Sequence, residues 1–104
     1  MKIKELKALY AEKKHGYFFS PGAMRFFESR LCQNVIVRES GYYFVTSEQF
    51  VSSEGVASPR KYTVRVMDKD TGDIDDLPHD SFQRYASSKE AFAAIEKAIV
   101  DGAI

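Results

Sequence analysis

The chain has 104 residues, with 15 Lys and Arg balanced by 15 Asp and Glu, one Cys, two His and no Trp. This length and ordinary composition predict one domain over residues 1–104, because domains most often have about 100–150 residues. The single Cys32 excludes an internal disulfide and a Cys-rich zinc site, and no apolar run is long enough to cross a bilayer. We therefore expect a soluble, cytoplasmic protein that does not act at a membrane.

The N-terminal segment predicts an amphipathic helix. Ile3, Leu6 and Tyr10 recur at the spacing of one helix face, and lysines occupy other positions around it. Gly16 follows a run of cationic side chains, and both cations and glycine favour the end of a helix. We expect this helix to end near His15.

A second helix is predicted to begin at Pro21. Ser20 can accept a hydrogen bond from a free N–H of the first turn, and proline has no N–H that needs a partner there. Met24, Phe27 and Leu31 continue the helical spacing, so about three turns are expected. The phenylalanines of this region are expected to form a core seam against the sheet, with a base-stacking or partner-docking platform as the alternative.

Beyond the second helix the apolar period becomes that of a strand. Residues 35–38 and 43–46 alternate on either side of Glu39-Ser40-Gly41, whose residue types favour a turn. This pattern predicts an antiparallel hairpin. Residues 47–60 lack sustained alternation, so we expect the end of the strand and a connecting loop with its tip at residues 52–55.

The clearest strand pattern covers residues 61–68, where apolar and polar side chains alternate without interruption. The stretch from Asp68 to Gly72 has the residue types of a tight turn and predicts a short fourth strand around residues 73–77. Residues 81–86 are expected to add an irregular extended segment. A meander is favoured, because sequential antiparallel strands need only short connections.

The last element is a predicted helix from residue 87 to Gly102. Ser87-Ser88-Lys89-Glu90 fits a capping box, and Phe92, Ile95 and Ile99 then follow one helix face. The whole order is helix, helix, three or four strands, helix. We expect an α+β domain in which three helices pack on one face of a three- to four-stranded antiparallel meander.

The acidic segment from Asp68 to Asp76 raises the question of a cation site, because hard cations prefer several oxygen ligands on one short loop. Its spacing does not fit a calcium loop, since Gly72 falls at the fifth position instead of the sixth. A hairpin turn with Gly72 at positive φ is the favoured interpretation, and a metal site is the alternative.

The other candidates for metal binding or nucleophilic catalysis are His15, Cys32 and His79, which are not spaced as a ligand set. A buried or half-buried Cys32 is expected. There is no glycine-rich phosphate loop. We therefore expect no catalytic residue, no metal and no cofactor. An enzyme would require the histidines or the acidic segment to converge in one pocket.

Charge is distributed unevenly along the neutral chain. Residues 1–31 carry seven Lys and Arg against three Glu, whereas residues 68–104 carry four against nine Asp and Glu. A solvated helix face is the ordinary explanation of such cations, and an acidic protein or a nucleic-acid backbone is the alternative. The candidates for nucleic-acid contact are Lys2, Lys7, Lys13, Lys14, Arg25 and Arg30.

A second positive cluster alternates along the third predicted strand. Lys61 and Arg65 project from one sheet face, which stays open to a partner if the helices cover the other face. Interface energy concentrates in Tyr and Arg, so we predict partner contacts by Arg60, Lys61, Arg65 and Tyr43, the tyrosine provided that it lies outside the core.

Three runs carry a family resemblance: YFFSPGAMRFF at residues 17–27, YFVTSEQF at residues 43–50 and PRKYTVR at residues 59–65, together with Thr71-Gly72. They resemble small uncharacterised proteins of bacteriophages and prophages over most of the chain. The resemblance implies a phage setting and no activity. Small phage proteins of this size commonly bind and block a host component, defence nucleases among them.

The sequence thus favours a non-catalytic phage or prophage accessory protein. It is expected to act by binding a host or phage protein, with inhibition of a host defence component as one form of that action. The alternative is a small nucleic-acid-binding protein that uses the basic N-terminal helices.

Overall fold

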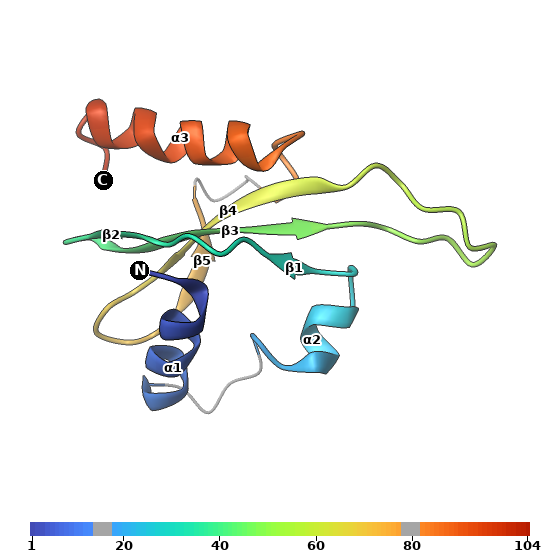
Figure 1. Cartoon of the computed structure of the whole chain (residues 1–104), viewed down its shortest axis with the longest axis horizontal. Helices are drawn as coiled ribbons and strands as arrows, with labels where there is room; N and C mark the ends of the chain where they lie inside the picture. The colour runs from blue at the N-terminus through green and yellow to red at the C-terminus, as the bar shows by residue number, and fades with distance from the viewer. Residues whose placement is uncertain (14–17, 78–81) are drawn as a thin grey trace.

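The computed structural model describes residues 1–13, 18–77 and 82–104. Its elements follow the expected order, with one more strand than predicted, and they form a mixed α+β fold. Figure 1 shows them in sequence colours. The helices are α1 (Ile3–Lys13), α2 (Pro21–Arg25) and α3 (Ser88–Val100), and the strands are β1 (Arg30–Leu31), β2 (Ile36–Arg38), β3 (Gly41–Glu48), β4 (Lys61–Met67) and β5 (Ile74–Asp76).

The sheet is antiparallel and is organised around β3. Strands β2 to β5 form the predicted meander, and the additional strand β1 also pairs with β3. The pairs Arg30↔Ser47 and Ile36↔Tyr43 show that β1 and β2 lie along the same edge of β3. This edge is interrupted between the two strands. At this interruption the N-terminus is hydrogen-bonded to the segment that leads into β2, because Val35 N donates to the Met1 carbonyl at 2.8 Å.

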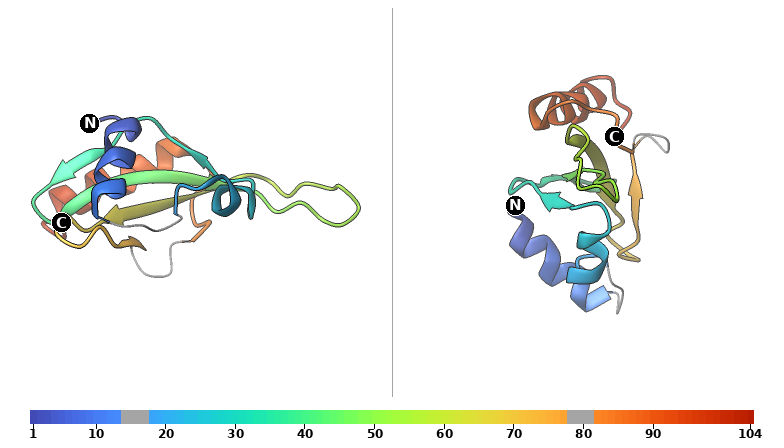
Figure 2. Two further views of the ribbon diagram at one scale, coloured as in Figure 1. Left: turned by 90° about the horizontal axis from the view of Figure 1, so that it is seen from below. Right: turned by 90° about the vertical axis from the view of Figure 1, so that its right-hand side faces the viewer.

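The helices cover both faces of the sheet. Helix α3 lies on one side, and α1 and α2 lie on the other (Figures 1 and 2). Phe44 packs with α1, whereas its neighbours Tyr43 and Val45 pack with α3. The expectation that all three helices share one face is therefore wrong. The reason is the apolar run in β3, since successive side chains of a strand point to opposite faces and both faces then need cover.

Helix α2 is shorter than predicted. It ends at Arg25, and Ser29 N donates to the Met24 carbonyl at 2.6 Å while Glu28 N donates to the Arg25 carbonyl at 3.2 Å. This is the bonding pattern of a Schellman motif, with Glu28 in the left-handed position at φ 49°. The prediction that the helix continues through Leu31 is wrong, because Leu31 pairs with β3.

The predicted helix starts are confirmed. Ser20 Oγ accepts from Ala23 N at 3.2 Å, and Ser87 Oγ accepts from Glu90 N at 3.2 Å. The second half of the predicted capping box differs in one respect: the Glu90 carboxylate accepts from Ala86 N instead of the serine N–H. Both caps satisfy first-turn N–H groups that the helix itself leaves unpaired.

The hairpin between β3 and β4 extends well beyond the sheet. We call residues 49–60 the arm; it projects from the body in Figures 1 and 2. Backbone bonds continue along it, since Ser58 N donates to the Phe50 carbonyl at 2.8 Å and Ser52 N donates to the Val56 carbonyl at 2.9 Å. Gly55, at φ 82°, closes the predicted tip.

The acidic segment forms the predicted turn between β4 and β5. Asp68 Oδ1 accepts from Asp70 N and Thr71 N, both at 2.8 Å, and Gly72 takes a φ of 77°. These backbone hydrogen bonds lower the pKa of the Asp68 carboxyl, because they stabilise its charged form. Further along, the expected extended segment contributes an isolated bridge between Tyr85 and Tyr62.

Candidate functional site

A buried polar cluster lies at the end of the sheet nearest the arm. On the face that α1 covers with apolar contacts, the positions toward the arm are polar instead. Thr46 and Glu48 of β3 and Thr63 of β4 are all buried, and Glu48 is only 1% exposed. Arg65 lies beside them, with a side chain that is 16% exposed. Such burial of polar groups is costly unless they are hydrogen-bonded.

Most of the cluster is bonded internally. Arg65 Nη1 donates to Asp76 Oδ1 at 2.6 Å, and Arg65 Nε donates to Thr46 Oγ1 at 3.1 Å. Thr63 Oγ1 donates to Glu48 Oε1, while the same hydroxyl accepts from Gln83 N at 2.9 Å. The cluster therefore connects β3, β4 and β5 with the segment before α3.

One buried oxygen of this cluster has no partner. No donor among the described residues bonds to Glu48 Oε2, although that atom is sealed from solvent. The nearest cation is Arg65, whose Nη2 lies 3.9 Å from the other carboxylate oxygen, Oε1. Unpaired buried acceptors are rare in folded proteins and cost about 1–3 kcal/mol each.

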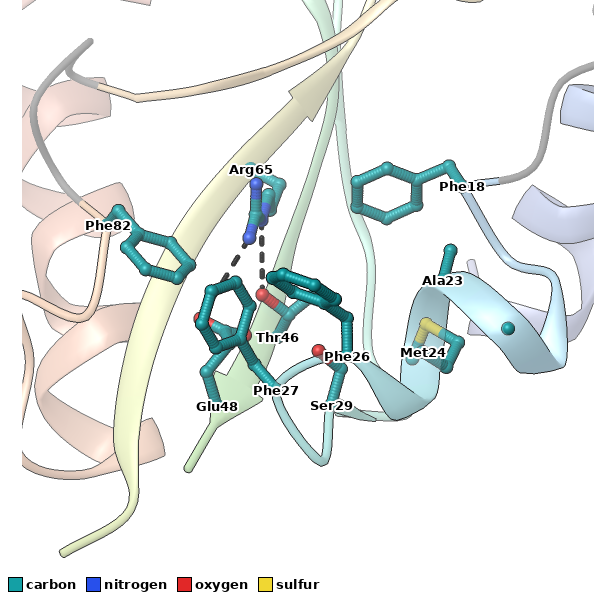
Figure 3. Close-up of a pocket in the computed structure, with 11 residues that line it drawn as sticks. Phe18, Ala23, Met24, Phe26, Phe27, Ser29, Thr46, Glu48, Arg65 and Phe82 are labelled. Carbon is teal, nitrogen blue, oxygen red and sulfur yellow. Dashed lines mark hydrogen bonds and ion pairs between the residues drawn. The ribbon is translucent and has the colours of Figure 1, made fainter. Parts of the chain in front are cut away.

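A cavity of about 450 Å³ opens beside this cluster, and Glu48 and Arg65 form part of its wall. Four of the other nine lining residues are phenylalanines (Figure 3). The Arg65 guanidinium carbon lies 5.4 Å from the Phe18 ring centre and 5.7 Å from that of Phe82. The volume falls within the range of about 300–1,000 Å³ that is usual for ligand sites.

The aromatic wall only partly matches the predicted core seam. Phe18 does pack against the buried Phe44, at 6.1 Å between ring centres. Phe26, however, is 78% exposed and stands edge-on to Phe27 at 4.5 Å. Phe27 in turn contacts Phe82 at 5.4 Å. The short α2 explains the difference, because the residues after Arg25 leave the helix and carry these rings to the cavity rim.

The four predicted partner-contact residues take different positions. Tyr43 is 3% exposed and its hydroxyl bonds to Ser40 Oγ at 2.6 Å, so the proviso that it lie outside the core is not met. Its face is buried because α3 covers it. Arg65 lies in the cavity wall, so it does not project from an open face, and Lys61 is half-buried at the start of β4.

Arg60 acts as a clamp at the base of the arm. Its Nη1 donates to the Glu28 carbonyl at 2.8 Å and to Ser47 Oγ at 3.0 Å, and its Nη2 donates to Gln49 Oε1 at 3.3 Å. These bonds join the segment after α2 to both strands of the arm. The side chain stays half-buried, so contact with a partner through Arg60 remains a prediction.

Of the cations predicted for nucleic-acid contact, Lys7 and Lys13 lie in α1 and Arg25 ends α2, whereas Lys2 precedes α1 and Arg30 begins β1. Lys14 falls outside the described residues. The five others are all exposed. Three of them have local contacts: Lys2 Nζ donates to Asn34 Oδ1 at 2.7 Å, Lys7 lies 6.0 Å from the Phe19 ring centre, and Arg25 Nε donates to the Pro21 carbonyl at 3.3 Å. In addition to the backbone hydrogen bonds of its turn, the charge of Lys13 contributes to the lowered pKa of the Asp68 carboxyl.

The candidates for metal or nucleophilic chemistry are not brought together in the described part of the chain. His15 and His79 lie outside the described residues. Cys32 is a free, half-buried thiol whose pKa is raised by burial and, second, by the negative charge of Glu48. Within the described ranges there is no group of three His, Cys, Asp or Glu placed to hold a metal ion.

The fold and this cavity define an α+β protein with a buried polar cluster at one end of its sheet. By sequence, the chain belongs to the family of unknown function DUF7447, whose model matches residues 2–96. No curated protein and no solved structure matches the chain. Among the described helices, none combines the length and the apolar character needed to span a membrane.

Proposed function

We propose that this protein is a non-catalytic accessory protein of a phage or prophage that acts, in the host cytoplasm, by binding another protein. The arm supplies the principal contact surface. Phe50 is 59% exposed and Val56 is 65% exposed, and Val51 beside them is also exposed. Exposed apolar side chains that gather on one projecting element are typical of interaction sites. This exposure is the observation that carries the proposal.

The charge of the arm favours a protein over a nucleic acid. Between residues 49 and 59 the only charged side chain is Glu54, and it is acidic. A surface that follows phosphates needs several cations, so the arm does not have that chemistry. Arg60 supports the arm by holding its base to the body.

Binding through the arm also accounts for inhibition without chemistry. A protein that acts by occupying a surface of its target needs exposed contacts and no reactive group. The resemblance to small phage and prophage proteins supports a host component as that target, with a defence protein as one instance.

The test compares proteins captured from host lysate by three versions of the chain. The arm variant carries Phe50→Ser and Val56→Ser, and the matched control carries Val100→Ser, which changes an 85% exposed valine at the end of α3. We expect one host protein to be enriched by the wild type and the control and lost with the arm variant. Equal capture by all three versions, or by none, contradicts the proposal.

The alternative function, nucleic-acid binding by the exposed cations of the N-terminal helices and of Arg30 in β1, is tested on the same samples. It requires mobility shifts at low salt that weaken steeply as salt rises, because each neutralised phosphate releases counterions. Charge removal at the exposed Lys13 and Arg30 would then weaken binding. The arm variant would bind as the wild type does.

A further inference from the structure

We propose that the cavity between α2 and the polar end of the sheet binds a neutral, flat heteroaromatic ring whose edge carries an N–H beside a carbonyl oxygen, as in uracil, thymine or hypoxanthine. The cavity has the volume for such a ring, about 450 Å³. The inference rests on two polar groups of its wall that no described residue hydrogen-bonds and on its aromatic lining. It does not depend on the arm or on the proposed protein partner.

Glu48 supplies the acceptor. Its Oε1 is already bonded to the Thr63 hydroxyl, and no described residue donates to its Oε2. A ligand N–H directed at Oε2 would satisfy an acceptor that the protein itself leaves unpaired. This matters because a site built to bond a polar edge rejects analogues that lack the bond, whose binding would leave the buried group unpaired.

Arg65 supplies the donor. Its Nε and Nη1 are held by Thr46 and Asp76, while Nη2 makes no hydrogen bond to a described residue and lies 3.9 Å from Glu48 Oε1. The carboxylate of Glu48 and the guanidinium of Arg65 thus lie side by side at the cavity wall, each with one group that no described residue hydrogen-bonds. A neutral edge with one donor and one acceptor matches both groups.

The remaining wall suits a flat aromatic body. Phe18, Phe26, Phe27 and Phe82 line the cavity and surround these polar groups (Figure 3). Bases stack favourably on aromatic side chains in nucleic-acid-binding proteins. The rings therefore select a planar ligand, and the polar pair selects its edge.

Two strained residues flank this aromatic wall. Glu28 follows Phe27 with φ 49°, and Gln83 follows Phe82 with φ 56°. Left-handed backbone at residues other than glycine is uncommon and clusters at ligand clamps and other functional sites. Because Glu48 Oε2 is buried, a ligand edge can reach it only when a side chain of the cavity wall moves aside. Phe26 and Phe82 are the exposed rings of the wall and are the least enclosed.

The test is a titration of the 15N-labelled protein with uridine, followed by amide chemical shifts. We expect saturable shifts at the cavity residues Phe27, Ser29 and Thr46. The probe 3-methyluridine carries a methyl group in place of the edge N–H, and it should bind at least tenfold more weakly. A hexamer of uridylate identifies the source of the ring: tighter, salt-dependent binding indicates a single strand and equal binding indicates a free molecule, and both results support the cavity site.

The decisive variant is Glu48→Gln. The glutamine carbonyl oxygen can still accept from the Thr63 hydroxyl, so the NH2 group should take the position of Oε2. Both this NH2 group and the uridine N–H are donors, so no hydrogen bond can form between them. We expect at least a tenfold loss for uridine and a shift of preference toward cytidine, whose ring nitrogen at that edge is an acceptor. Glu54→Gln, at the exposed tip of the arm, should bind uridine as the wild type does.

A second variant covers the case in which Glu48→Gln does not fold. Ala23 lines the cavity from α2 and makes no polar side-chain contact, so Ala23→Leu fills the space without altering the polar cluster. It should abolish the uridine shifts. The proposal is overturned if uridine shifts no cavity amide, if 3-methyluridine binds equally well, or if Ala23→Leu leaves binding unchanged.

Discussion

Replacement of Gly41 by alanine tests how closely β3 and β4 approach at the start of the sheet. Gly41 is buried and takes a φ of +155°, which side chains rarely adopt. A Cβ added there would lie 2.8 Å from Val66 Cγ2 and 2.9 Å from the Met67 carbonyl oxygen. The second contact is with a backbone atom, which cannot rotate away as a side chain can, so β3 and β4 themselves must move apart.

Two separate energetic costs determine how much Gly41→Ala should destabilise the fold. The unfavourable φ contributes about 1–3 kcal/mol, and the overlap with β4 contributes about 1–3 kcal/mol more. Alanine also restricts the unfolded chain, which offsets about 0.4–1 kcal/mol. We expect the free energy of unfolding to fall by about 1–6 kcal/mol and Tm to fall by about 4 °C or more.

Two other glycines provide matched controls in a urea or thermal unfolding assay. Gly55 has a φ of +82° and open space around it, so Gly55→Ala should show only the backbone cost, about 1–2 kcal/mol. Gly22 lies in α2 with open space and no positive φ, so Gly22→Ala should be neutral or slightly stabilising. If Gly41→Ala is no more destabilising than Gly55→Ala, the close approach of β3 and β4 is refuted.

Three further predictions follow from the core and the titratable groups. Phe44→Ala should cost about 3–5 kcal/mol in urea unfolding, because Phe44 is fully buried under α1; a loss below 1 kcal/mol would contradict that packing. Asp68 should titrate below the usual aspartate range in carboxyl NMR. Because its pKa is lower in the folded state, Asp68 stabilises the fold above the unfolded pKa, and this stabilisation is lost as pH falls through the folded pKa. Asp68→Ala should remove that pH dependence of stability. Cys32 should react with a thiol reagent at pH 8 more slowly than in the urea-unfolded chain, because its raised pKa and partial burial leave little accessible thiolate, and equal rates would count against its burial.

Local signals in the sequence predicted the strands β2 to β5 and the helix starts. The caps at Ser20 and Ser87 and the turn at Asp68 each depend on side chains that bond to backbone a few residues away. Such features can be recognised without knowledge of tertiary contacts. The end of α2 could not be recognised in this way, because Glu28 occupies the left-handed position where glycine is the usual signal.

The sequence does contain a signal that both sheet faces are covered, the continuous apolar run Tyr43-Phe44-Val45. A strand covered on one face alone needs apolar side chains only at every second position. The candidate cavity had a weaker signal. Polar residues continue the alternation of β3 and β4 toward the arm, but an exposed face gives the same pattern. Only the packing of α2 and of the segment around Phe82 makes that face buried, and such long-range contacts are not encoded in periodicity.

The most direct test of the proposed function is photo-crosslinking from the arm. Phe50 is replaced by photoreactive p-benzoylphenylalanine, and Val100 is replaced in the same way as the control, in the cells in which the protein is made. The account predicts one discrete adduct with a different protein from position 50 and none from position 100. An adduct only with a second copy of the chain, the same products from both positions, or no adduct at all would contradict it.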